Sequence, residues 1–197
     1  SRFATESMRA ASTPALRCQA AYEKRPVIGG TTPARIALRR ALNLAVDIPR
    51  EISLARRGQA VPAHSPIVPH TSGYDPQYKS ENGDFDPARA KALLDLYGYV
   101  DKNGDGWREQ PDGSPLLLEY ATDPAPERRQ LAEQWERNMT ALGVRITFKI
   151  AKWPEQLKAS RAGKLMMWRV GSSASVTDGQ EVLQRLHGPQ VGQGNLA

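Results

Sequence analysis

The sequence contains little of what disulfide frameworks and metal clusters require. It has one cysteine, Cys18, and three histidines among 197 residues. A single cysteine excludes an internal disulfide and any site built from several thiolates. Such cysteine usage fits the cytoplasm, and it equally fits a periplasmic protein that needs no disulfide.

Long hydrophobic runs are also missing. No apolar stretch approaches the roughly 20 residues that a helix needs to cross a bilayer. The first residues, Ser1-Arg2-Phe3, are not followed by the apolar region of a secretory signal peptide. We therefore expect a soluble chain, with any export signal removed or lying outside it.

Catalytic motifs are absent as well. The sequence contains no nucleophile elbow, no phosphate-binding loop, no zinc-protease motif and no glycine fingerprint of a dinucleotide-binding fold. Ser172, Ser173 and Ser175 could act as nucleophiles only beside a base, and His187 is the nearest histidine in the sequence. No supporting triad pattern is present, so we predict that the protein is not an enzyme.

Positive charge is in excess, with a formal net charge of +6 and a pI near 9.6. Such a balance suggests a nucleic-acid partner. Arg35, Arg39 and Arg40 share one predicted helix, but basic residues of other predicted helices alternate with Asp and Glu, as on ordinary solvated faces. We therefore predict no nucleic-acid partner.

An acidic, glycine-rich loop at residues 101–112 supports two interpretations. Asp101, Asn103 and Asp105 match the opening of an EF-hand calcium loop, where oxygens occupy alternate positions. The twelfth position is Asp112 rather than glutamate, and the apolar run after it predicts a strand where an EF-hand has its second helix. The alternative is a turn whose Asn and Asp side chains accept bonds from nearby backbone N–H groups. The sequence favours the turn and leaves a weak Ca²⁺ site at Asp101, Asn103 and Asp105 open.

Capping residues and apolar spacing predict the elements. Residues 1–24 lack periodicity and predict a poorly ordered arm, which one α/β lobe at 25–197 follows. Helices are predicted at about 33–46, 49–58, 87–97, 127–142, 153–161 and 180–186, and strands at about 115–120, 144–150 and 165–170. Prolines within residues 61–78 predict an extended loop.

The alternation of strands and helices from residue 116 to residue 170 predicts the fold class. It is typical of an α/β layer, here a mixed sheet flanked by helices. In such sheets, ligands gather beyond the carboxyl ends of the strands. We therefore expect a binding site first in the loop after Val170.

Several segments resemble a known family. Residues 33–47 are similar to the R-R-A-I-x-x-A-x-D helix of the family 5 extracellular solute-binding proteins, the peptide and nickel class of ABC importer receptors. Residues 58–63 resemble the family's G-x-A-x-P-A turn. Residues 86–99 resemble its D-P-x-x-A-K-x-L-L-x-x-x-G-Y helix, and residues 105–113 the acidic loop that follows. The resemblance covers roughly residues 24–197.

The resemblance implies one lobe of a two-lobed periplasmic binding protein-like fold, with the other lobe of the parent chain outside these residues. Such a receptor binds a peptide or another small solute at the periplasmic or extracellular face of a bacterial inner membrane. It delivers the solute to an ABC permease and requires no cofactor. The alternative function is a calcium-stabilised α/β structural or interaction module that uses the loop at residues 101–112.

The resemblance also implies where the ligand lies. The expected ligand-binding residues surround the last predicted strand: Trp168, Arg169, Ser172, Ser173, Ser175 and Asp178. Peptide-binding members carry a tryptophan and an aspartate at the positions of Ser172 and Ser175, and that aspartate holds the peptide's α-amine. A hydroxyl leaves a buried ammonium poorly compensated. We therefore expect an uncharged, anionic or differently oriented solute, with Arg169 or backbone N–H groups as its partners.

Overall fold

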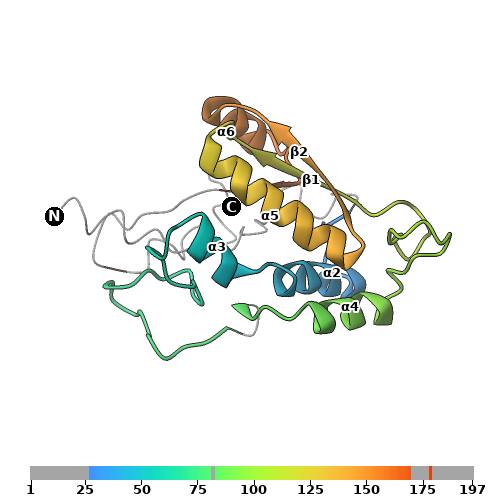
Figure 1. Cartoon of the computed structure of the whole chain (residues 1–197), viewed down its shortest axis with the longest axis horizontal. Coiled ribbons are helices and arrows are strands. Elements are labelled where there is room, and N and C mark those ends of the chain that lie inside the picture. The colour runs from blue at the N-terminus through green and yellow to red at the C-terminus, as the bar shows by residue number, and fades with distance from the viewer. Residues whose placement is uncertain (1–26, 81–82, 170–177, 179–197) are drawn as a thin grey trace.

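The computed structural model describes residues 27–80, 83–169 and 178 (Figure 1). Its elements follow in the order α2 (Pro33–Leu44), α3 (Ile48–Leu54), α4 (Pro87–Leu96), β1 (Leu117–Thr122), α5 (Pro126–Leu142), β2 (Arg145–Ile150), α6 (Trp153–Arg161) and β3 (Met167–Trp168). The predicted arm at residues 1–24 and the predicted helix at 180–186 lie outside the described residues. Within the described ranges, no helix is both long enough and apolar enough to span a membrane.

Helices α2 and α4 begin with the same local device, a capping side chain followed by proline. Thr32 Oγ1 accepts a hydrogen bond from the Arg35 backbone N–H at 3.4 Å, and Asp86 Oδ1 accepts one from the Arg89 N–H at 2.9 Å. The next residue is a proline in both helices, and its fixed φ suits the first helical position, where no N–H is needed. These starts confirm the predicted ones.

The two capped helices lie side by side and bury small and branched residues between them (Figure 1). Leu38 and Ala41 of α2 and Ala90 and Leu94 of α4 are fully buried. Small residues at helical spacing let the helix axes approach closely, while the leucines fill the remaining space. The pair therefore forms one layer of the core.

The second layer is a parallel sheet with strand order β2-β1-β3. β1 aligns with β2 from Leu117↔Arg145 to Thr122↔Ile150, and α5 lies across these strands in Figure 1. Tyr120 packs against both neighbours, with ring centroids 5.3 Å from Trp135 of α5 and 5.9 Å from Phe148 of β2. The predicted α/β class is confirmed, and the described strands are all parallel where a mixed sheet was predicted.

Helix α5 ends at Gly143, which adopts the left-handed conformation with φ 78° that closes many helices. Its turn is tied to the acidic loop, because the Arg108 backbone N–H donates to Gly143 O at 2.7 Å and Arg108 Nε donates to Leu142 O at 2.8 Å. The loop is thereby held against the start of β2.

One continuous hydrophobic core joins the two layers. Its buried members come from the segment before α2 through β3 and include Ile28, Leu42, Leu118, Met139 and Met167. Trp135, predicted to be a core residue rather than a ligand contact, is 5% exposed within this cluster. The helical layer and the sheet therefore form one packed body.

Some predicted boundaries and one predicted burial pattern differ from the structure. The strand expected at residues 165–170 is reduced to Met167–Trp168, because β3 pairs only with Tyr120 and Ala121 of β1. β2 was expected to bury one whole face, yet Ile146 and Phe148 are only half-buried, as suits a strand with β1 as its single described partner. Helix α3 ends at Leu54, and a turn rather than helix reaches Gly58.

Candidate functional site

The carboxyl ends of β1, β2 and β3 meet along one side of the sheet because the three strands are parallel. We call this side the carboxyl edge and define it by Asp123 after β1, Trp153 after β2, and Trp168 with Arg169 at the end of β3. Open α/β sheets bind ligands outside such an edge. It is therefore the first place to examine for a binding site.

Two tryptophans stack at the carboxyl edge. The rings of Trp153 and Trp168 have centroids 5.5 Å apart and an interplanar angle of 27°. Trp168 is 4% exposed, whereas Trp153 is 47% exposed and presents apolar ring surface to solvent. The indole N–H of Trp168 is buried and has no hydrogen-bond partner within the described part of the chain. A half-exposed indole held by a buried one is a rigid apolar surface on which a solute can pack.

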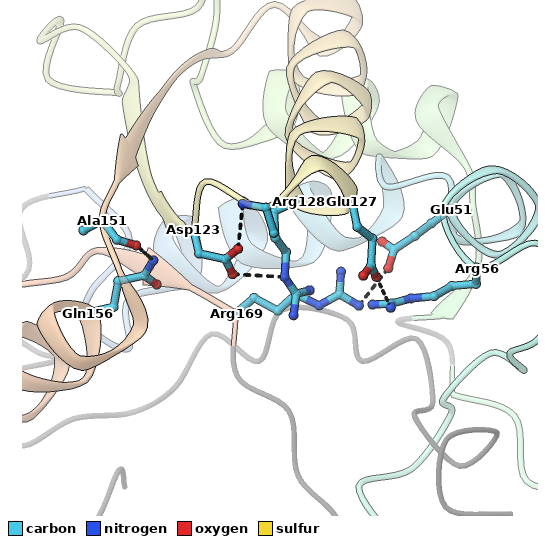
Figure 2. A network of polar contacts seen from close by, with 9 residues as sticks. Glu51, Arg56, Asp123, Glu127, Arg128, Ala151, Gln156 and Arg169 are labelled. Carbon is cyan, nitrogen blue, oxygen red and sulfur yellow. Dashed lines mark hydrogen bonds and ion pairs between the residues drawn. The ribbon is translucent and has the colours of Figure 1, made fainter. Parts of the chain in front are cut away.

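Three ion pairs form a cluster that includes Arg169, the residue directly after Trp168 (Figure 2). Glu51 of α3 pairs with Arg169 at 2.9 Å, and Asp123 pairs with Arg128 of α5 at 3.1 Å. Arg56, just after α3, pairs with Glu127 in the first turn of α5. The Glu51–Arg169 and Arg56–Glu127 pairs join distant parts of the chain, whereas the Asp123–Arg128 pair is local to the start of α5.

Burial shapes the electrostatics of this cluster. Desolvation lowers the pKa of Arg56 from its ordinary value, and the positive charge of nearby Arg169 lowers it further. Burial also raises the pKa of Tyr120, beneath the cluster, to about 12. The tyrosine is therefore a neutral phenol at physiological pH.

The structure describes three of the six predicted ligand-binding residues, and these three do not all lie in one place. Trp168 and Arg169 lie at the carboxyl edge, buried or half-buried. Asp178 is exposed, and it forms an isolated parallel bridge with Ser72 of the proline-rich loop. Ser172, Ser173 and Ser175 lie outside the described residues. The loop predicted at residues 61–78 therefore lies beside one member of the expected ligand set.

The acidic loop is a hydrogen-bonded turn. The two carboxylate oxygens of Asp101 accept the N–H groups of Gly104 at 2.7 Å and Gly106 at 2.8 Å. Asn103 Oδ1 accepts the Asp105 N–H at 2.9 Å, and Asp105 Oδ2 accepts from Arg145 at 2.7 Å. The backbone bonds, that from Gly106 first, lower the pKa of Asp101. The structure thus has the turn geometry that the sequence favours, with β1 where an EF-hand would have a helix.

A cation site at Asp101, Asn103 and Asp105 stays a prediction. Asp101, Asp105 and Glu109 each place a carboxylate oxygen within 4.8 Å of the others, so Glu109 is a further candidate ligand beside the predicted residues. Glu109 is 9% exposed, and its Oε2 accepts the Lys102 N–H at 2.7 Å. Exposed acidic groups of this kind are common without an ion.

Sequence reasoning missed most of the charged cluster. Glu51 carries one signal, since it lies three residues after Ile48 and thus on the same face of α3, where both side chains are buried. Nothing in the sequence pairs Glu51 or Glu127 with its arginine, because these two contacts depend on how the helices pack against the sheet. The pair of Asp123 and Arg128 is local and was also missed.

Solved structures define the class of fold. Residues of this chain superpose on AppA, an oligopeptide-binding protein from Bacillus subtilis in complex with a nonapeptide, with a TM-score of 0.69, 21% identity, and coverage of 78% of this chain and 30% of that one. NikA from Brucella suis, in complex with Fe(III)-EDTA, superposes with a TM-score of 0.67 and 23% identity. That match covers 80% of this chain and 31% of NikA. The fold is therefore that found in two-lobed periplasmic binding proteins.

The family follows from the sequence. Residues 28–194 match the family described as bacterial extracellular solute-binding proteins, family 5 Middle. This chain belongs to that family, whose members are binding and transport receptors. The resemblance seen in the motifs is confirmed.

Two curated relatives give the scale of the match. Di/tripeptide-binding protein 2 of Pseudomonas aeruginosa is 29% identical over 129 residues, which cover 64% of this chain and 22% of that protein. Heme-binding protein A of Haemophilus influenzae is 28% identical over 166 residues, which cover 82% of this chain and 28% of that protein. The chain thus spans about a quarter of the length of the curated relatives it matches.

Proposed function

We propose that this chain forms one lobe of the ligand-binding receptor of an ABC importer, which captures a peptide or another small solute at the carboxyl edge. The observation that carries the proposal is the half-exposed Trp153, stacked on Trp168 beside a cluster of paired arginines, in a chain of the family 5 fold. Apolar surface with a few fixed polar groups is typical of small-molecule sites.

The mechanism we propose is closure of two lobes around the solute. A second lobe, a permease partner and a periplasmic location are supported by the family and by the part of its relatives that the chain spans. Closure removes ligand and site from water and presents one recognisable shape to the permease. Binding without chemistry is supported by the absence of catalytic motifs in the sequence and by the transport role of the family.

Native mass spectrometry of the receptor that carries this chain, purified gently from its own host, tests the proposal. We expect a bound small molecule in the wild type. A ladder of peptide masses would assign peptides and contradict the expectation drawn from Ser172 and Ser175, whereas a single non-peptide mass would identify the solute class.

Two tryptophan variants locate the bound solute. Trp153→Ala removes the exposed indole of the carboxyl edge and should abolish the bound mass. Trp107→Ala is the matched control, because this indole lies within the acidic loop and packs against Arg145, whose Cζ is 5.4 Å from the ring centroid. Equal loss in both variants, or no bound solute in any sample, would contradict a site at the carboxyl edge.

A further inference from the structure

Glu51 is the most deeply buried charged side chain of the carboxyl-edge cluster. It is 2% exposed, although it lies on α3, a helix of only two turns. Its Oε1 lies 2.9 Å from Arg169 Nη2 in an ion pair that lacks hydrogen-bond geometry, and the Arg169 side chain is 13% exposed. A buried carboxylate without a cationic partner is strongly destabilising. Glu51 therefore depends on Arg169, and Arg169 is committed to Glu51 before any solute arrives.

The charges of the cluster balance pair by pair. Arg169 faces Glu51, Arg128 faces Asp123, and Arg56 faces Glu127. Figure 2 shows the three arginine side chains running into one region from different elements. A cluster of three arginines would ordinarily attract anions. Here each positive charge already has a carboxylate partner, and the most buried of those carboxylates is Glu51.

We propose that Glu51 is a specificity-determining residue that neutralises Arg169, so that the carboxyl edge selects solutes with no carboxylate or phosphate at this position. The inference rests on the proposed receptor function and names the solute class of that site. An anion at Arg169 has to displace Glu51 and leave a buried charge unpaired, or lie beside a like charge. An uncharged solute meets neither cost.

The proposal is tested by titrating sulfate, as the anionic probe, into the 197-residue chain and following arginine side-chain N–H signals by NMR. The Arg169 side-chain signal is identified as the one that is missing from the spectrum of Arg169→Lys. In the wild type we expect no saturable shift of this signal. In Glu51→Gln, which keeps the shape and removes the charge, we expect saturable binding that is at least about tenfold tighter than any wild-type response.

Two further variants separate the role of Glu51 from net charge and from folding. Glu127→Gln changes the cluster charge by the same amount at the partner of Arg56, and it should leave the Arg169 signal unresponsive. Glu51→Asp keeps the charge and should behave as the wild type does. A saturable sulfate shift in the wild type or in Glu51→Asp overturns the proposal, whether or not Glu51→Gln folds.

Two further outcomes would each contradict the proposed role of Glu51. Sulfate binding in Glu127→Gln equal to that in Glu51→Gln would show that net charge, not Glu51, controls the site. No binding in a folded Glu51→Gln chain would show that Glu51 does not keep anions away. The failure of the receptor proposal is recognised separately, by a parent protein that carries no solute, because the sulfate titration requires no natural ligand.

Discussion

Arg108 shows how one side chain can fix segments that lie far apart in the sequence. Its Nε donates to Leu142 O at 2.8 Å and its Nη1 to Tyr99 O at 2.5 Å, and it pairs with Asp95. It therefore satisfies a carbonyl at the end of α5 and another just after α4, where a cation also complements the helix dipole.

Replacing Arg108 by methionine should lower the free energy of unfolding by roughly 2–4 kcal/mol, because two backbone carbonyls lose a charged donor. Urea denaturation measures the change. Arg137→Met, at an exposed position of α5, is the control and should change stability by less than about 0.5 kcal/mol. Equal effects of the two substitutions would show that the Arg108 contacts contribute nothing specific.

The Asp101 carboxylate should make the stability of the acidic loop depend on pH. Its pKa in the folded chain lies below the ordinary value because backbone N–H groups bond the ionised form. A depressed pKa gives stability that is present above the unfolded pKa and lost as pH falls through the folded pKa. The free energy of unfolding, measured from neutral to acid pH, should therefore fall less steeply in Asp101→Asn than in the wild type. Parallel curves would contradict this assignment.

Among the elements, the acidic turn offers a direct test for a cation. Both oxygens of Asp101 accept backbone N–H groups, and Asp105 Oδ2 accepts from Arg145. Since the turn is held by these bonds, we expect urea unfolding to be unchanged between excess EDTA and calcium chloride, with magnesium chloride as the control for ionic strength. A calcium-specific gain in stability would establish the site, because a ligand that binds only the folded chain must stabilise it.

The helices were the most predictable elements because their signals are local. Thr32 and Asp86 cap helices that begin where predicted, and α6 has the predicted bounds of Trp153–Arg161. Strand length was less predictable, since β3 extends only as far as β1 offers it a partner.

Of the candidate site, sequence reasoning found Trp168 and Arg169 but not the carboxylate that holds Arg169. Local patterns describe a residue's own helix or strand, whereas Glu51 meets Arg169 only after α3 has packed against the end of β3. Trp153 was likewise predicted only as the start of a helix, because its stacking on Trp168 is a tertiary contact.

At the scale of the whole molecule, the continuous core predicts cooperative unfolding. The cluster links Leu38 of α2 and Leu94 of α4 with Leu118 of β1 and Trp135 of α5. All four tryptophans lie at or after Trp107, so fluorescence reports only the later part of the chain, while far-UV circular dichroism also reports α2 and α4. Because one core holds both layers, the urea transitions seen by the two probes should coincide. Separate midpoints would show that the helical layer unfolds independently.

The stacked pair of Trp153 and Trp168 has an optical consequence. Two indoles with centroids 5.5 Å apart couple their electronic transitions, and the strength and sign of the coupling depend on the angle between the rings. A solute that packs on Trp153 and turns its ring alters that coupling. The chain therefore carries an intrinsic chromophore pair at its carboxyl edge, through which near-ultraviolet circular dichroism can follow occupancy without a label.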